Sequence, residues 1–249
     1  MLAGALIAFA LGLAAGSFAT AVAYRVPRGV SLASRSRSQC PACGTEIAAR
    51  DNVPVFSWLQ LRGRARCCGA PISPRYPLTE LAVAALFVAA TLVHRDDPAE
   101  VAIDMVFVTM LAVVTLTDLE RRIIPNVVLL AGSVLCLAIA IPTDPGELPE
   151  RAIAAAAAGG LLLAVVFAYP KGMGLGDVKL AAVMGLFLGR AVAPAIMIAL
   201  FAGSAVGLAL IARHGPNARK MAIPFGPFLA LGGAVAMLVG DQLIDLYLG

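Results

Sequence analysis

The chain has 249 residues, of which 60% are hydrophobic and 14% charged, and its mean hydropathy is +0.90. These values lie far outside the range of soluble globular proteins, so they exclude a soluble enzyme and indicate a polytopic membrane protein. The formal net charge of +4 does not by itself require a nucleic-acid partner, because the distribution of the positive residues decides its meaning.

Residues 1–24 are apolar, and the first positive charge, Arg25, comes after them. A cleaved signal peptide carries its positive charge before the apolar stretch. The order found here therefore predicts an uncleaved first membrane span with its N-terminus outside. Gly12 and Gly16 are four residues apart, a spacing that is typical of a helix-packing face.

Residues 25–76 form a long hydrophilic segment with nine arginines against two acidic residues, Glu46 and Asp51. An excess of arginine next to membrane spans is retained in the cytoplasm. An RNA-binding patch is an alternative explanation of the same charge, but membrane orientation explains it without a partner. The chain is therefore predicted to contact the lipid bilayer and to bind no nucleic acid.

Two short cysteine clusters lie within this segment, Cys40-Pro41-Ala42-Cys43-Gly44 and Cys67-Cys68-Gly69. In a reducing compartment such clusters favour a zinc knuckle over disulfides. Adjacent cysteines reach one ion only with strain, so Cys40, Cys43 and Cys68 are predicted as ligands ahead of Cys67. A reduced loop without metal is the alternative. Cys136 falls inside a predicted span and is expected in the core.

Further apolar segments, each close to the ~20 residues that a helix needs to cross a bilayer, predict more membrane spans. They cover about 77–94, 100–118, 124–142 and 151–169. The apolar sequence from Asp177 to Ala212 is too long for one span, and Arg190 and Pro194 divide it in two, with an external turn at 189–194. With a last span at about 225–248, the sequence predicts an all-α membrane protein of about eight transmembrane helices.

The charges agree with this topology. It places 16 of the 19 Lys and Arg residues in the cytoplasm and leaves Arg95, Arg151 and Arg190 outside. A single span over 178–212 would instead expose Arg213, Arg219 and Lys220, which fits the positive-inside rule less well.

Two aspartates stand at the predicted cytoplasmic ends of different spans. Asp118 ends the apolar run VFVTMLAVVTLTD, and Asp177 follows the glycine-rich turn GMGLG, with Lys171 and Lys179 placing it at the same membrane face. Two carboxylates close together cannot both ionise, so one acts as acid and the other as base on a water, as in aspartic proteases. The alternative is that Asp177 only caps the next helix.

The residues around Asp177 suggest how such a site is built. Gly172, Gly174 and Gly176 are expected to take φ values closed to other residues and to leave room for an extended substrate backbone. Lys179 is a candidate for lowering one of the two pKa values, although on a helix it points away from Asp177.

The run Gly174-Leu175-Gly176-Asp177 resembles the GxGD motif of intramembrane-type aspartyl proteases. With Asp118 and the cysteine loop it makes the chain, from Gly16 to the PFGPFLALG run at 224–232, similar to the type IV prepilin peptidases. The resemblance implies that Asp118 and Asp177 are catalytic. It also implies supporting roles near the substrate for Gly174, Gly176, Lys179 and Glu80.

The resemblance further implies the substrates and cofactors. Such enzymes remove the leader of type IV prepilins and of type II secretion pseudopilins at the cytoplasmic face of the bacterial inner membrane. They then methylate the new N-terminus from S-adenosylmethionine. On this basis residues 1–24 are the first helix, 25–76 the methyltransferase-associated loop with its zinc, and 77–249 the peptidase domain.

Three alternatives remain open at this point. Ala65 stands where the family usually has a cysteine, so a peptidase without methyltransferase activity is one of them. Glu80 either takes part in methyl transfer or forms a salt bridge to an arginine of the loop. A proton- or ion-coupled transporter would use aspartates near mid-bilayer in broken helices. Because Asp118 and Asp177 are predicted at one edge of the membrane, hydrolysis is favoured.

Overall fold

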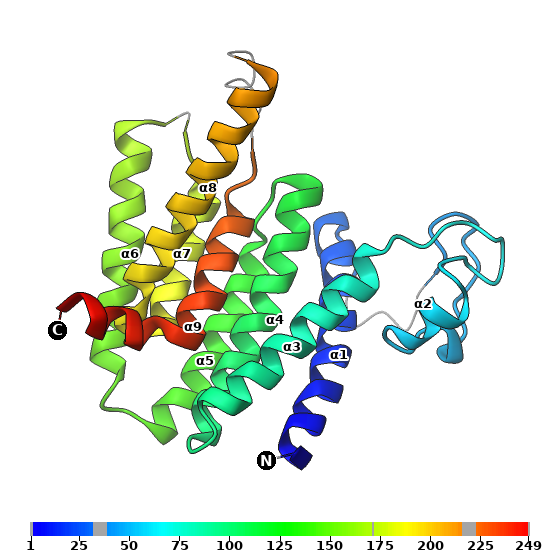
Figure 1. Ribbon diagram of the computed structural model, residues 1–249, viewed down its shortest axis with the longest axis horizontal. Helices are drawn as coiled ribbons and strands as arrows, with labels where there is room; N and C mark the ends of the chain where they lie inside the picture. Colours follow the sequence, from blue (N-terminus) through cyan, green and yellow to red (C-terminus); the bar gives the residue numbers. More distant parts are fainter. Residues whose placement is uncertain (1, 32–38, 171, 216–222, 249) are drawn as a thin grey trace. The chain divides into compact units, whose positions relative to one another are not determined.

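The computed structural model describes residues 2–31, 39–170, 172–215 and 223–248. Lys171 and residues 216–222 of the last predicted cytoplasmic loop lie outside this part. Within it the chain is helical, and its only β-type pairing is two isolated bridges, which confirms the all-α fold class (Figure 1). The chain divides into two compact units, Met1–Arg95 and Asp96–Gly249, which are described in turn.

The first unit is built on two long helices, α1 (Leu2–Arg25) and α3 (Arg75–Val93), which pack along each other. Glycines of α1 form the contact. A Cβ added to Gly12 would lie 2.5 Å from Cα of Ala84, and one added to Gly16 would lie 2.6 Å from Cα of Glu80. The predicted packing face is confirmed, since the missing side chains let the two backbones approach closely.

This contact makes a prediction for stability. Gly16→Ala is expected to destabilise the protein by about 1–3 kcal/mol, because the new methyl group would overlap backbone atoms that cannot move aside. Gly4→Ala, in the same helix and with open space around it, is the matched control and should be neutral or slightly stabilising. Denaturant unfolding in detergent measures both variants. Equal stability of the two variants would contradict the packing argument.

Between α1 and α3 the chain forms a small folded loop. It contains the short helix α2 (Phe56–Gln60) and the 3₁₀ turns η1 (Val26–Arg28) and η2 (Ala49–Asp51). Single β-bridges, Gln39 with Glu46 and Arg64 with Pro71, close two tight turns, and each turn carries one cysteine cluster. Arg66 lies 3.0 Å from Asp51 and holds the pKa of that carboxyl group below its usual range. This ion pair links η2 to the second turn.

The second unit packs six long helices together (Figure 1). In chain order these are α4 (Pro98–Arg121), α5 (Asn126–Thr143), α6 (Leu148–Ala168), α7 (Leu175–Leu188), α8 (Val192–His214) and α9 (Gly226–Leu248). Helix α4 contacts α5, α7 and α9, and α7 also contacts α5, α6 and α9. Phe107 of α4 stacks on Phe187 of α7 with ring centroids 4.8 Å apart. The two helices that carry the predicted aspartates are therefore in direct contact.

The predicted break in the long apolar run is confirmed. Helix α7 ends at Leu188, Gly189 has φ 53°, and α8 begins at Val192 after the 3₁₀ turn η3 (Gly189–Ala191). Figure 1 shows α8 returning in the opposite direction to α7. Seven helical stretches of the described residues are long and apolar enough to cross a membrane, and one of these, Leu175–His214, has 40 residues and contains both helices. The count of about eight spans treats α7 and α8 separately.

Polar contacts of Glu150 and Arg151 hold this break in place. Arg151, near the start of α6, donates to the carbonyl of Phe187 at 2.7 Å and to Glu100 of α4 at 2.7 Å. The neighbouring Glu150 accepts the backbone N–H of Arg190 at 3.1 Å. One arginine thus joins the first turns of α4 and the last turn of α7. These contacts fix the ends of α4 and α7 that lie far from Asp118 and Asp177 along each helix.

Candidate active site and metal site

Asp118 lies in the last turn of α4, and its buried carboxyl group is held by α9. Its Oδ2 accepts the backbone N–H of Gly226, the first residue of α9, at 2.9 Å. The N-terminus of a helix carries partial positive charge and favours an anion. A Cβ at Gly226 would lie 2.7 Å from this oxygen, so the contact requires glycine. The sequence did not assign Gly226 a role, and the PFGPFLALG run was the signal that could have indicated one.

Asp177 is the third residue of α7 and is also buried. Its Oδ2 accepts the backbone N–H of Gly174, the N-cap residue, at 3.2 Å. Asp177 therefore does cap the helix, as the structural alternative expected, but it does so from the third helical position and not as the N-cap. The bond fixes one oxygen of the carboxyl group and thereby its orientation.

The glycines before Asp177 do not have the φ values that were expected of them. Gly174 has φ −83°, Gly176 lies within α7, and neither they nor Gly172 take a positive φ. The predicted use of φ values closed to other residues was wrong here. Two of them stand at close approaches instead, since a Cβ on Gly176 would lie 3.2 Å from Ile124 and one on Gly172 would overlap the ring of Tyr169.

Asp118 and Asp177 lie in the last turn of α4 and the first turn of α7, two helices that contact each other, and both side chains are buried. The Nζ of Lys179 donates to Oδ1 of Asn126 at the start of α5, at 3.1 Å. An aspartic dyad needs two such carboxyl groups to share one proton, so these two residues are the candidates for acid and base catalysis.

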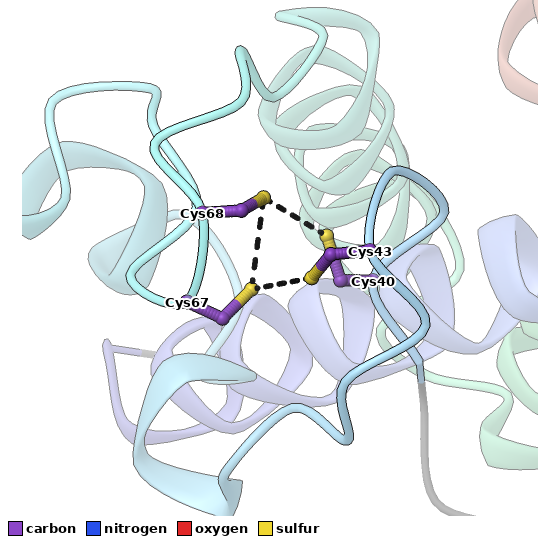
Figure 2. A group of neighbouring side chains, drawn as sticks. All are labelled: Cys40, Cys43, Cys67 and Cys68. Carbon is purple, nitrogen blue, oxygen red and sulfur yellow. Dashed lines mark hydrogen bonds between the residues drawn. The ribbon is translucent and has the colours of Figure 1, made fainter.

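The four cysteines of the loop also come together (Figure 2). Their Sγ atoms all lie within 4.8 Å of one another, and Figure 2 shows the four side chains pointing toward a common centre. The Sγ of Cys40 lies 3.7 Å from that of Cys68, and the Sγ of Cys43 lies 3.3 Å from that of Cys67. Four thiolates around one Zn²⁺ at ~2.3 Å would stand ~3.8 Å apart, so the cluster fits a tetrahedral zinc ion.

The two turns that carry these cysteines have the same backbone hydrogen bonds. In the first turn Cys40 N–H donates to Thr45 and Gly44 N–H donates to the carbonyl of Cys40. In the second turn Ala65 and Gly69 repeat both bonds, with Ala70 in the place of Thr45.

It follows that Ala65 occupies the position of Cys40, and Cys68 that of Cys43. The fourth sulfur comes from Cys67, which corresponds to Ala42. Cys67, two residues further along the same turn, thus replaces the cysteine that is missing at Ala65.

The thiols on the first turn are prepared for metal binding. The Thr45 hydroxyl, 3.3 Å from Sγ of Cys43, lowers the pKa of Cys43 to about 6. Backbone hydrogen bonding at Ala42 lowers the pKa of Cys40 below its ordinary value. Because the thiolate is the form that binds a metal, these shifts favour binding by the first turn, whereas hydrogen bonding to Cys43 raises the pKa of Cys67 to about 12.

Glu80 lies on α3 and contacts the loop by a backbone bond. Its buried carboxylate accepts the N–H of Val55 at 2.7 Å, at the start of α2. Val55 has φ 61°, a conformation that β-branched residues rarely adopt. The contact found for Glu80 is thus to the backbone of the loop.

Fold and site together define a class, a polytopic membrane protein of the aspartic-peptidase type with a separate four-cysteine cluster. Comparison with known proteins narrows this class. Residues 10–94 match the Bacterial Peptidase A24 N-terminal domain, and residues 105–212 match the Type IV leader peptidase family. The boundary between the two matches lies where the structure divides into its two units.

Curated relatives match over most of the chain. A prepilin leader peptidase/N-methyltransferase of Bacillus subtilis is 35% identical over 244 residues, covering 97% of both chains. One of Aeromonas hydrophila is 36% identical and covers 85% of this chain and 74% of its own, and one of Pseudomonas putida is 32% identical, covering 95% and 91%. The chain belongs to the type IV leader peptidase family. No solved structure matches it significantly.

Proposed function

We propose that this protein is a membrane aspartic endopeptidase that removes the leader of type IV prepilins or pseudopilins, with Asp118 and Asp177 as its catalytic pair. The observation that supports the proposal is that α4 and α7 contact each other and that each carries a buried aspartate at its end, Asp118 on α4 and Asp177 on α7. The names of the relatives supply the class of substrate.

The reaction needs one proton shared by the two carboxyl groups, because like charges close together do not both ionise. The ionised group takes a proton from a water molecule, whose oxygen attacks the carbonyl carbon of the scissile peptide bond. The protonated group gives its proton to the carbonyl oxygen. The tetrahedral intermediate then collapses, the C–N bond breaks and the amide nitrogen leaves with a proton. Each such transfer contributes about 10²- to 10⁴-fold to the rate.

In each of the two carboxyl groups one oxygen accepts a backbone hydrogen bond, and the other oxygen is left for the reaction. Oδ2 of Asp118 is bound to Gly226 and Oδ2 of Asp177 to Gly174. Oδ1 of each is then the atom that handles the water or the substrate.

Gly226 allows a direct test of this arrangement. Gly226→Ala is expected to lower the rate of leader cleavage by about 10-fold or more, because the new methyl group pushes the Asp118 carboxylate out of position, and misplacement by ~1 Å costs up to 10²-fold. The matched control is Gly207→Ala, in α8 with open space around it, which should cleave normally. Cleavage rates and thermal stability in detergent are measured for both variants. A normal rate for Gly226→Ala would contradict the role of this glycine.

The proposal includes N-methylation of the new N-terminus from S-adenosylmethionine, as the names of the relatives state for those proteins. It also includes a zinc ion held by Cys40, Cys43, Cys67 and Cys68. Zinc with four thiolates has no open position, so its contribution is to cross-link the two turns of the loop. Glu80 supports this loop by binding Val55.

The proposed location is the bacterial inner membrane, with the active site on the cytoplasmic side. The multi-pass character follows from the seven candidate spans and the family. The orientation is supported by the nine arginines of residues 25–76, which the positive-inside rule assigns to the cytoplasm.

Mass spectrometry of a prepilin incubated with the purified full-length protein tests the function. The expected result is loss of the leader, followed by the mass gain of one methyl group when S-adenosylmethionine is present. Cleavage without methylation would show that the protein is a peptidase without methyltransferase activity. An uncut substrate, together with proton or ion flux in proteoliposomes that depends on Asp118 and Asp177, would favour the transporter instead.

A further inference from the structure

Helix α2 presents an apolar face to the solvent. Val53, Phe56 and Leu59 are 46%, 62% and 60% exposed. The turn begins before the helix, since Ser57 N–H donates to the carbonyl of Val53. The spacing of three residues places Phe56 and Leu59 on one side of the helix, and Val53 is exposed in the turn just before it. Exposed apolar side chains that gather on one face mark a surface for a partner or a membrane.

The position of α2 along α3 indicates the partner. The first turn of α2 is bound to Glu80 through the N–H of Val55. Glu80 is the sixth residue of α3, and helical side chains tilt toward the N-terminus, so its carboxylate reaches back toward Tyr76. Tyr76 at the start of α3 and Tyr24 at the end of α1 are both exposed, as is typical of the aromatic belt at a membrane surface. Helix α2 thus begins at the level of the lipid headgroups.

The charges around α2 complement an anionic surface. Arg50 precedes α2, Arg62 and Arg64 follow it, and all three side chains are exposed. One of the two acidic residues of the loop, Asp51, is paired with Arg66. Basic residues beside an apolar face are typical of segments that lie in the interface of an anionic membrane.

We propose that α2 is an interfacial anchor, with Val53, Phe56 and Leu59 inserted at the boundary of headgroups and acyl chains and Arg50, Arg62 and Arg64 bound to anionic lipid. The anchor would fix the cysteine loop against the bilayer, in addition to the bond from Glu80. The partner is the lipid surface itself, so the proposal does not depend on the peptidase activity.

The single tryptophan of the chain makes the proposal testable, because Trp58 lies within α2 and all tryptophan fluorescence reports on this helix. Full-length protein is reconstituted in vesicles of phosphatidylglycerol and phosphatidylcholine that carry bromine at shallow or deep acyl positions. Shallow bromine is expected to quench Trp58 more than deep bromine, because interfacial helices lie ~5–10 Å into the boundary region. Vesicles of phosphatidylcholine alone should give less quenching.

Variants separate the proposal from other occupants of the same face. Phe56→Ser with Leu59→Ser should lose most of the quenching, while Phe56→Leu and the polar control Gln60→Ser should keep it. Equal thermal midpoints in detergent show that the loop is still folded. Absence of quenching at every depth, quenching that ignores anionic lipid, or protection of Trp58 only when a prepilin is added would each overturn the proposal.

Discussion

Replacing Asp118 or Asp177 by asparagine is expected to lower the rate of leader cleavage by about 10²- to 10⁴-fold, the contribution of a positioned acid or base. Asparagine has the same shape, and its amide oxygen can still accept the N–H of Gly226 or Gly174, so the fold should persist. It cannot exchange a proton, and the shared-proton chemistry stops. The measurement is the rate of leader release by purified protein, with the thermal midpoint determined alongside.

Two controls sharpen this result. The double variant should cleave little more slowly than either single variant, because residues that act as one unit are not additive. Asp104→Asn changes another buried aspartate of the same helix α4, and it should cleave at a rate close to that of the unmodified protein. If either Asn variant at Asp118 or Asp177 cleaved normally, the dyad would be excluded and the transporter would become the better hypothesis.

The sequence predicted the helices well, because their signals are local. The length of the apolar stretches indicated the spans. The break between α7 and α8 followed from the residues that interrupt one of these stretches, Gly189, Arg190 and Pro194. The positions of Asp118 and Asp177 at helix ends could also be predicted from the ends of the apolar stretches, while their pairing stays a prediction.

The contacts that position the site residues could not be predicted from the sequence. Gly226 and Asp118 are 108 residues apart in the chain, and only the packing of α9 against α4 brings them together. The glycines before Asp177 were assigned to unusual φ values, yet what the structure shows at Gly176 is the close approach of Ile124. The sequence alone does not show whether a glycine is present because of its φ value or because another residue lies close to it.

The same holds for the division of the chain and for the cysteines. The assignment of residues 1–24, 25–76 and 77–249 to separate functions stays a prediction, while the structural units meet at Arg95. The sequence ranked Cys67 below Cys68 because adjacent cysteines were expected to reach one ion only with strain. In the turn at 65–70 both sulfurs face Cys40 and Cys43.

Cys67→Ser is expected to weaken zinc binding by about 10²- to 10³-fold, as much as Cys68→Ser does. Structural zinc sites are worth roughly 10–16 kcal/mol, and the loss of one of four equal ligands removes about a quarter of that. Zinc content of the purified protein and competition with a chromophoric chelator measure the effect. Cys136→Ser is the matched control, because this cysteine is buried in α5 and lies outside the cluster.

The repeated hydrogen bonds of the two turns make a stronger test possible. Because Ala65 occupies the position of Cys40, adding Ala65→Cys to Cys67→Ala should restore tight zinc binding with a new spacing of ligands. Restored affinity would show that the second turn is a knuckle of the same geometry as the first, whose fourth ligand has moved by two residues. Undiminished zinc binding by Cys67→Ser would instead mean that the other three thiols hold the ion without it. If Ala65→Cys did not restore zinc binding, the two turns would be equivalent in their backbone hydrogen bonds but not in the positions of their ligands.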